Sequence, residues 1–345
     1  MARHPQRGAS LPELLVGALV GLVVTVVMLD VLANAEGFKR NATGLAEAQQ
    51  TGTLSTFTLG AELANAGNGL AAAARELATC PDTRDIGTSL RPIPVLITAG
   101  ATPNAPDAFV VNYGVGAALA TPMPFAAGAA AGSAYRIHAP TGLAAGDAIV
   151  AMSLDGRCAA TTAITVSPPD PDGVVDVGYA GVADAFPATS VLLDLGQKSR
   201  VQRVRYDIVD GTLRSLDLAN PGATPNPLAS NIVNMKLQYG IDADNDGFLD
   251  DWVPAAAAPW DPPSMLAAPA LALGQIKAIR LGLIVKSETF DRRVTTPFDW
   301  VLFDCGQEDK TRCPGRLAGT LPPNWRYRTY ETVIPLRNPI WNARP

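Results

Sequence analysis

The chain has 345 residues, a length that fits one large globular domain or two modest ones. Hydrophobic residues make up 48% of it and charged residues 17%, and this apolar share excludes general disorder. The net charge of -5 argues against the broad phosphate-binding face that nucleic-acid binding needs. Two histidines leave little material for mechanisms that require a pair of His ligands or a His base.

The first predicted element is an apolar helix near the N-terminus. Residues 1–8 contain two arginines and a histidine but no acid, and residues 14–29 carry no charge. Extended back to Ala9, the stretch approaches the ~20 residues that a membrane-spanning helix needs, with Glu13 as its one interruption. We therefore expect a transmembrane segment at about residues 9–30, with the basic start on the cytoplasmic side.

Glu13 needs an explanation because a carboxylate in a membrane helix costs about 2.5 to 3.5 kcal/mol. Cleavage of the chain after Gly8 would create an α-amino group on Ala9, four residues before Glu13. On a helix these positions lie one turn apart, so the new ammonium would pair with the carboxylate. The pair, formed within one subunit or between adjacent subunits, would offset part of the cost.

A short basic leader ending in Gly8, followed by Ala-Ser-Leu-Pro-Glu and an apolar stretch, resembles the class III signal of type IV pilins and type II secretion pseudopilins. The resemblance implies cleavage by a prepilin peptidase between Gly8 and Ala9 and methylation of the new N-terminal residue. It also implies that Glu13 docks the subunit into a filament. One departure is Ala9, where these families most often have phenylalanine, and it bears on the efficiency of processing.

Two other interpretations of the N-terminus stay open. An ordinary secretory signal has the same basic start and apolar stretch, and residues 33–35, Ala-Asn-Ala, supply a cleavage pattern. Cleavage after Ala35 would release an exported calcium-binding adhesin or enzyme. Against this, Glu13 lies where such a signal is apolar, and Asp30 follows the stretch. The other alternative is a plain membrane anchor.

The helix is expected to continue beyond the apolar stretch. Apolar residues recur at the spacing of one helical face, at Leu54, Phe57, Ala61 and Ala64. Residues 67–69, Gly-Asn-Gly, form a stop signal, so the helix should cover residues 9–66. Four glycines between residues 37 and 60 each weaken a helix by about 1 kcal/mol relative to alanine, which predicts a bend or local melting.

Residues 67–345 are expected to form a β-rich head of one or two lobes. Short apolar runs separated by Pro, Gly and Asp predict antiparallel strands at 108–113, 148–153, 191–195, 201–209, 212–218, 232–240, 276–286 and 328–336. The alternation in residues 276–286 is typical of a sheet with one face buried. Composition alone leaves 114–147 and 253–274 open as ordered or mobile loops. The predicted fold class is α+β, the type IV pilin-like arrangement of a long N-terminal helix and an antiparallel head.

The second half of the chain carries a more specific resemblance. Residues 203–206 (RVRY), 231–240, 276–286 and 327–338 together resemble the PilW-like minor pilins. This implies a subunit anchored by one span in the inner membrane, with its head in the periplasm before it joins a type IV pilus at the cell surface. Implied partners are other minor pilins, the major pilin and, at the tip, an adhesin. A type II secretion pseudopilin has the same architecture and is the nearest alternative.

An acidic loop offers a candidate metal site. Residues 242–247 fit the D-x-[DN]-x-[DN]-G opening of a calcium loop, with Phe248 offering a backbone carbonyl. The twelfth position is Val253, so the bidentate Glu of an EF-hand is missing. The expected ligands are Asp242, Asp244, Asp246, Phe248 and Asp250. The alternative is a solvated Asp/Asn/Gly turn between strands, and the sequence favours neither.

The four cysteines are Cys80, Cys158, Cys305 and Cys313, an even set in a chain predicted to leave the cytoplasm. That context favours disulfides. Three pairings exist, and proximity favours Cys305 with Cys313, which leaves Cys80 for Cys158. Metal binding is disfavoured because the chain has neither C-x-x-C spacing nor a nearby histidine.

No catalytic residue is predicted. The sequence contains no G-x-x-x-x-G-K-[ST], H-E-x-x-H or G-x-S-x-G motif. His138, in a Tyr-Arg-Ile-His run, is typical of a surface or strand residue rather than a base. We therefore expect a structural subunit and not an enzyme.

Overall fold

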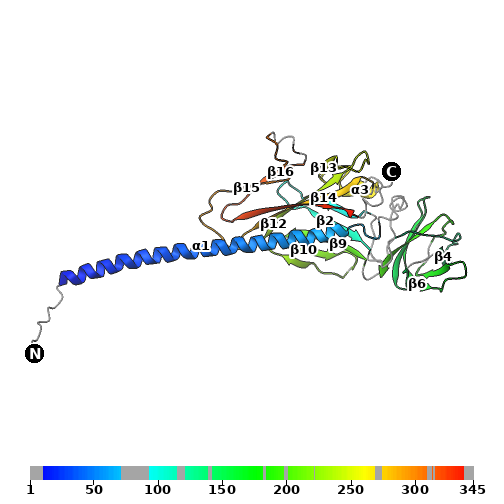
Figure 1. Ribbon diagram of the computed structural model, residues 1–345, viewed down its shortest axis with the longest axis horizontal. Coiled ribbons are helices and arrows are strands. Elements are labelled where there is room, and N and C mark those ends of the chain that lie inside the picture. Colours follow the sequence, from blue (N-terminus) through cyan, green and yellow to red (C-terminus); the bar gives the residue numbers. More distant parts are fainter. Residues whose placement is uncertain are drawn as a thin grey trace, which may run out of the picture.

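A computed structural model describes residues 11–70, 93–114, 121–138, 142–181, 184–197, 201–220, 222–268, 274–308, 313 and 315–337. A long N-terminal helix is followed by antiparallel sheets, so the predicted α+β class is confirmed. Figure 1 shows the helix projecting from the head at one end and a separate lobe, which contains β4 and β6, at the other end.

The helix α1 (Leu11–Asn65) runs without a break for 55 residues. Of the bend or local melting expected at its glycines, the local melting is wrong. Gly44 and Gly52 lie where the helix meets the head, and their missing side chains make that contact close: a Cβ on Gly44 would lie 3.3 Å from Thr289 Oγ1, and one on Gly52 would overlap the Tyr330 ring. Packing against the head therefore offsets the low helix propensity of glycine.

Two sheets share the main core with α1. The first has the order β1-β2-β9-β10-β11, with β1 (Val95–Thr98), β2 (Ala108–Tyr113), β9 (Gln202–Val209), β10 (Thr212–Asp217) and β11 (Asn226–Ala229). The second has the order β13-β12-β14-β17, with β13 (Asp251–Val253), β12 (Ile232–Ile241), β14 (Ile276–Lys286) and β17 (Tyr327–Pro335). One cluster of buried apolar side chains contains members of both sheets and of α1.

The strand β14 is buried on both faces, and the prediction of one buried face is wrong. Its odd-numbered residues, such as Leu281 and Leu283, belong to the core shared with α1. On its other face, Ile284 packs with Trp300 and Leu302 of a hairpin formed by β15 (Phe298–Leu302) and β16 (Leu317–Leu321). The hairpin is a second apolar layer, so the polar residues of β14 are covered as well.

The face of α1 that packs on the head is the opposite of the one that hydrophobic spacing indicates. Leu54 is 61% exposed and Phe57 73% exposed. The buried residues, spaced four or three apart, are Gly44, Ala48, Gly52, Ser55, Leu59 and Leu63. Small residues let β14 and β17 approach the helix axis, and the larger apolar residues stay exposed.

A six-stranded sheet forms the separate lobe between β2 and β9, with the order β3-β8-β5-β6-β7-β4. Its strands are β3 (Met123–Pro124), β8 (Val191–Gln197), β5 (Asp147–Met152), β6 (Cys158–Val166), β7 (Val174–Tyr179) and β4 (Tyr135–His138). An isolated bridge between Phe125 and Ile137 joins its two ends and encloses an aromatic cluster. Residues 121–138, which composition left undecided, thus contain β3 and β4.

The second undecided region contains α3 (Pro262–Ala267), whose Met265 is buried in the main core. His138 lies exposed at the end of β4, as its sequence context indicates. The two undecided regions that contain β3, β4 and α3 are rich in alanine, whose small side chain gives a weak hydrophobic period.

Candidate assembly surface and acidic loop

The N-terminal half of α1 presents an uncovered apolar surface. Every described side chain from Leu11 to Ala33 is exposed, including Leu14, Leu19 and Leu29. This stretch is long and apolar enough to cross a membrane, and none of it is buried inside the protein. Contact with the head begins at Asn34, whose Oδ1 accepts a hydrogen bond of 3.2 Å from Arg293 Nη2.

Glu13 lies in the first turn of α1 and is exposed. An acid in this position also interacts favourably with the positive end of the helix dipole. Gly8 and Ala9, the residues expected at the processing site, lie outside the described residues. The structure therefore places Glu13 near the start of the exposed apolar stretch Leu11–Ala33, away from the head.

The second half of α1 is held firmly by β17. The Tyr330 hydroxyl donates a hydrogen bond of 3.2 Å to the Ala48 carbonyl, and its ring covers Gly52. Leu59 and Leu63 are fully buried in the main core. One continuous helix thus joins the head to the exposed apolar stretch Leu11–Ala33.

The acidic loop brings together part of the expected ligand set. Carboxylate oxygens of Asp242, Asp244 and Asp250 lie within 4.8 Å of one another, and Asp242 is buried. Asp246 is outside this group, and its Oδ1 accepts the Phe248 N–H at 2.8 Å. The Phe248 side chain points to solvent, 75% exposed.

Backbone amides and one lysine already contact these carboxylates. The Asp242 oxygens accept the N–H groups of Asp246 and Gly247 at 3.1 and 3.0 Å. Lys277 Nζ lies 3.8 Å from Asp242 Oδ2. The loop is therefore pre-shaped, with one cation of the protein beside its most buried acid, and three oxygens remain grouped as a hard cation prefers.

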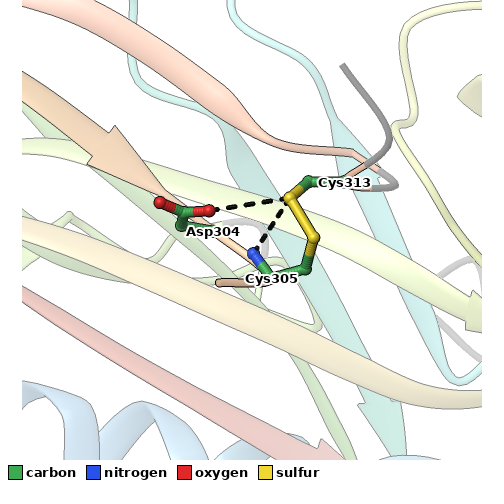
Figure 2. A group of neighbouring side chains, drawn as sticks. All are labelled: Asp304, Cys305 and Cys313. Atoms are coloured by element: carbon green, nitrogen blue, oxygen red, sulfur yellow. Dashed lines mark hydrogen bonds between the residues drawn. A yellow bond between two sulfur atoms is a disulfide. The ribbon is translucent and has the colours of Figure 1, made fainter. Parts of the chain in front are cut away.

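Cys305 and Cys313 form a disulfide with a Cα–Cα distance of 5.3 Å, the pairing that proximity favours (Figure 2). Asp304 Oδ1 lies 3.6 Å from Cys313 Sγ. Because both sulfurs are oxidised, this group offers no thiolate to a metal. Cys158 is also disulfide-bonded. Cys80, its expected partner, lies outside the described residues.

Arg280, on β14, contacts residues from β12, from the end of the acidic loop and from the β15–β16 hairpin, and the sequence did not reveal this role. Its guanidinium lies 4.8 Å from the Trp252 ring centroid and 4.4 Å from that of Phe303. Nε donates to Gln238 Oε1 at 2.6 Å, and a Cβ on Gly315 would overlap this pair. Burial lowers the pKa of Arg280 to about 10. The arginine remains charged at pH 7 and stabilises the face opposite α1 by cation–π contacts.

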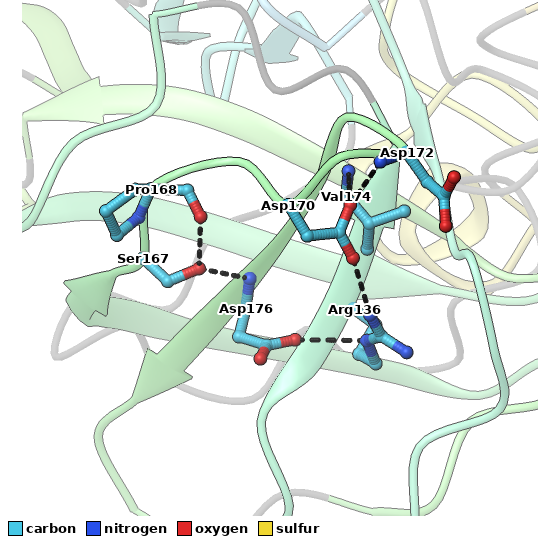
Figure 3. Close-up of polar contacts among 7 residues, drawn as sticks. All are labelled: Arg136, Ser167, Pro168, Asp170, Asp172, Val174 and Asp176. Carbon is cyan, nitrogen blue, oxygen red and sulfur yellow. Dashed lines mark hydrogen bonds and ion pairs between the residues drawn. The ribbon is translucent and has the colours of Figure 1, made fainter.

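The lobe carries a polar network on its surface. Arg136 on β4 makes ion pairs with Asp170 at 3.0 Å and Asp176 at 3.2 Å, as Figure 3 shows. Asp170 Oδ1 also accepts the N–H groups of Asp172 and Val174, which closes the turn before β7. These exposed pairs fix the turn, and each contributes little to stability.

We expect the buried Asp194, on β8 of the lobe, to make the free energy of unfolding depend on pH. It is 5% exposed, and Oδ1 accepts the Gly196 N–H at 2.7 Å. Among the residues that the structure describes, Oδ2 has no hydrogen-bond partner. Burial, opposed by the Gly196 bond and reinforced by Asp147, raises the pKa of Asp194 to about 6. Because the folded pKa lies above the unfolded value, the stabilisation is present below pH 4 and is lost as the pH rises through 6.

We expect Asp194→Asn to remove about 1–3 kcal/mol of pH dependence between pH 4 and 8 and to raise the melting temperature at pH 7.5. Asparagine keeps the acceptor for Gly196 and carries no charge. Thermal unfolding at several pH values measures the effect, with the exposed Asp172→Asn as control. Equal pH profiles for the wild type and Asp194→Asn would contradict the prediction.

Comparison with known families connects the head to one of them. Residues 198–338 match the family model for PilW, described as Type IV Pilus-assembly protein W. The match confirms the resemblance expected from the sequence. It begins after the lobe and covers the β9–β17 part of the head. No curated protein and no solved structure matches the chain.

Proposed function

Because residues 198–338 are PilW-like, which connects the chain to type IV pilus assembly, we propose that it is a minor pilin. In this proposal a prepilin peptidase cleaves between Gly8 and Ala9. Before assembly, α1 anchors the protein in the inner membrane and the head lies in the periplasm. It then joins other pilins in the filament, and the head makes lateral contacts.

The observation that carries the proposal is the division of α1 into two halves. The half from Leu11 to Ala33 is apolar and uncovered, and the half after Asn34 is packed on the head. A helix of this kind needs lipid before assembly and other apolar helices after it. Transfer of the apolar half of α1 from lipid to other apolar helices costs little free energy. Helix packing and the pairing of Glu13 then favour the filament.

The alternative cleavage after Ala35 fits the structure less well. Residues 33–35 lie inside the continuous helix α1, next to the contact between Asn34 and Arg293. A cut there would remove the apolar half and leave the packed half as the start of a free secreted domain. The PilW match also favours a pilus over a type II secretion filament. Mass spectrometry of the mature protein tests the proposal because each alternative leaves a different first residue.

We further propose that the acidic loop binds calcium through Asp242, Asp244 and Asp250, with a stabilising role. The grouping of three carboxylate oxygens supports this. Asp246 and the Phe248 carbonyl are the remaining expected ligands. A bound calcium ion would neutralise the repulsion between carboxylates that Lys277 offsets only in part.

We expect chelation of calcium to lower the melting temperature, since a ligand at 100 times its Kd stabilises a protein by about 2.7 kcal/mol. The measurement is thermal unfolding of the full chain with calcium and with EGTA. Asp244→Asn should reduce the shift, and Asp172→Asn, on the lobe, should leave it unchanged. A melting temperature that does not respond to EGTA would remove the calcium proposal.

A further inference from the structure

A groove runs between α1 and the free edge of β17. One section has a volume of about 510 Å³ and is lined by one face of the helix, by residues 330–335 of β17 and by Arg337. A second section continues it past Gln49, Phe298 and Tyr327. The groove therefore follows the whole length of β17.

The wall formed by β17 is its backbone edge. Six consecutive residues, 330–335, line the groove, whereas a strand that presented one face would contribute every second residue. β17 pairs with β14 along its other side. Within the described part of the chain, β17 has no second strand partner. A long edge of this kind has backbone N–H and C=O groups ready to pair with another chain.

The opposite wall is an uncharged stripe of α1. The helix residues in the two sections are Gln49, Thr53, Thr56, Phe57, Gly60, Ala61 and Ala64. At about 1.5 Å per residue the stripe is about 22 Å long, and the nine residues of β17 extend about 30 Å. At about 3.3 Å per residue, the two lengths fit an extended segment of about seven to nine residues.

The chemistry of the two walls selects the kind of partner. The β17 edge needs backbone donors and acceptors, which an extended segment has free and a helix has already used. The α1 wall is uncharged, and the charged residues of the groove, Arg328, Glu331 and Arg337, lie on the β17 side. A side chain of the incoming segment that faces α1 should therefore be uncharged. The stripe is also on the same helix as the uncovered apolar half, so the groove continues that surface.

We propose that this groove receives an extended strand of a neighbouring pilin subunit, which adds to the β12–β14–β17 sheet beside β17. The inference rests on the proposed function, because the neighbour is another pilus subunit. Strand addition would fix the rotation of the head relative to its neighbour, whereas packing of smooth apolar helices leaves it free. Phe57, exposed on the groove wall, would cover the incoming strand.

Hydrogen exchange of the full chain in detergent micelles tests the inference, alone and after co-expression with each other pilin of the same cell. In the complex, amides of alternate β17 residues should exchange at least about tenfold more slowly, because every second N–H faces the groove. Protection without this alternation, or no protection with any pilin, would overturn strand addition.

A matched pair of variants tests the groove wall. Phe57→Asp should lower co-purification of the neighbouring pilin about tenfold, and Leu54→Asp should leave it unchanged. Both residues are exposed apolar side chains of α1, and Leu54 lies outside the groove. Equal loss for both variants would contradict the inference. Protection already present in the isolated chain, and lost when residues 338–345 are removed, would assign the groove to that segment instead.

The first residue of the mature protein, measured in the same samples, tests the proposed function separately. Processing at Gly8 should be unchanged in both variants, since the substitutions lie far from the leader. Correct processing with no strand pairing would reject the groove inference alone. A mature protein that starts at residue 36 would reject the minor pilin proposal itself.

Discussion

Glu13→Ala is expected to leave the protein in the membrane and to reduce its incorporation into pili by about 100-fold. Removing one partner of a buried ion pair costs about 3–5 kcal/mol, because the other charge stays buried alone, and each ~1.4 kcal/mol is tenfold in an equilibrium. In the proposed function the remaining charge is the α-amino group that cleavage would create on Ala9. Insertion into lipid should persist or improve, since alanine costs less there than a carboxylate.

Immunoblots of sheared pili and of membranes measure the two quantities separately. The control is Glu47→Ala, which removes an exposed acid from the part of α1 beside the head. Glu13→Gln should behave like Glu13→Ala, because it keeps the size of the side chain and loses the charge. If Glu13 acts only through the dipole of the first helical turn, Glu13→Ala will assemble almost normally, and the docking role is then wrong.

Gly52→Ala is expected to destabilise the head by about 1–3 kcal/mol, although alanine is the better helix former. A Cβ on residue 52 would overlap the Tyr330 ring, so either the ring or the helix must move. Movement of the ring also breaks the hydrogen bond from its hydroxyl to Ala48. The effect therefore falls on the contact that joins α1 to β17.

Gly60→Ala is the matched control on the same helix. Its Cβ would lie 3.8 Å from Ile334 Cγ1, an ordinary contact, so helix propensity should raise the free energy of unfolding by about 1 kcal/mol. Chemical denaturation of both variants measures the difference. Stabilisation by Gly52→Ala would mean that α1 and β17 do not approach closely in solution.

The elements that could be predicted are those whose side chains give a strong local signal. The β-branched runs at 201–209, 232–240 and 276–286 predict β9, β12 and β14 to within two residues. Four of the six lobe strands were missed because strands such as β6 consist largely of Ala and Thr, and because β3 is two residues long. The enclosure of the lobe depends on pairing across the chain, which no local pattern contains.

The helix face was predicted wrongly for a physical reason. Hydrophobic spacing assumes that the largest apolar side chains mark the buried face. In α1 the head contact selects glycine, alanine and serine in its first turns, and Leu54 and Phe57 remain outside. Gly44, Ala48 and Gly52 recur every four residues on one face of α1. Such a period of small residues predicts a close helix contact, just as a period of large apolar residues predicts a buried face.

The candidate sites were predicted unevenly. The acidic loop is a contiguous motif, and three of its four acids converge in the fold. Arg280 and Asp194 were missed because each looks like an ordinary polar residue on a strand. Their environments come from partners far along the chain, Trp252 and Phe303 around the arginine and Asp147 beside the acid.

The mass of the mature protein isolated from its own cells tests the central claim most directly. We predict a chain that begins at Ala9 and carries one additional methyl group on its α-amino nitrogen. A chain that begins at residue 36, or one that keeps the first eight residues, would contradict assembly through a processed α1.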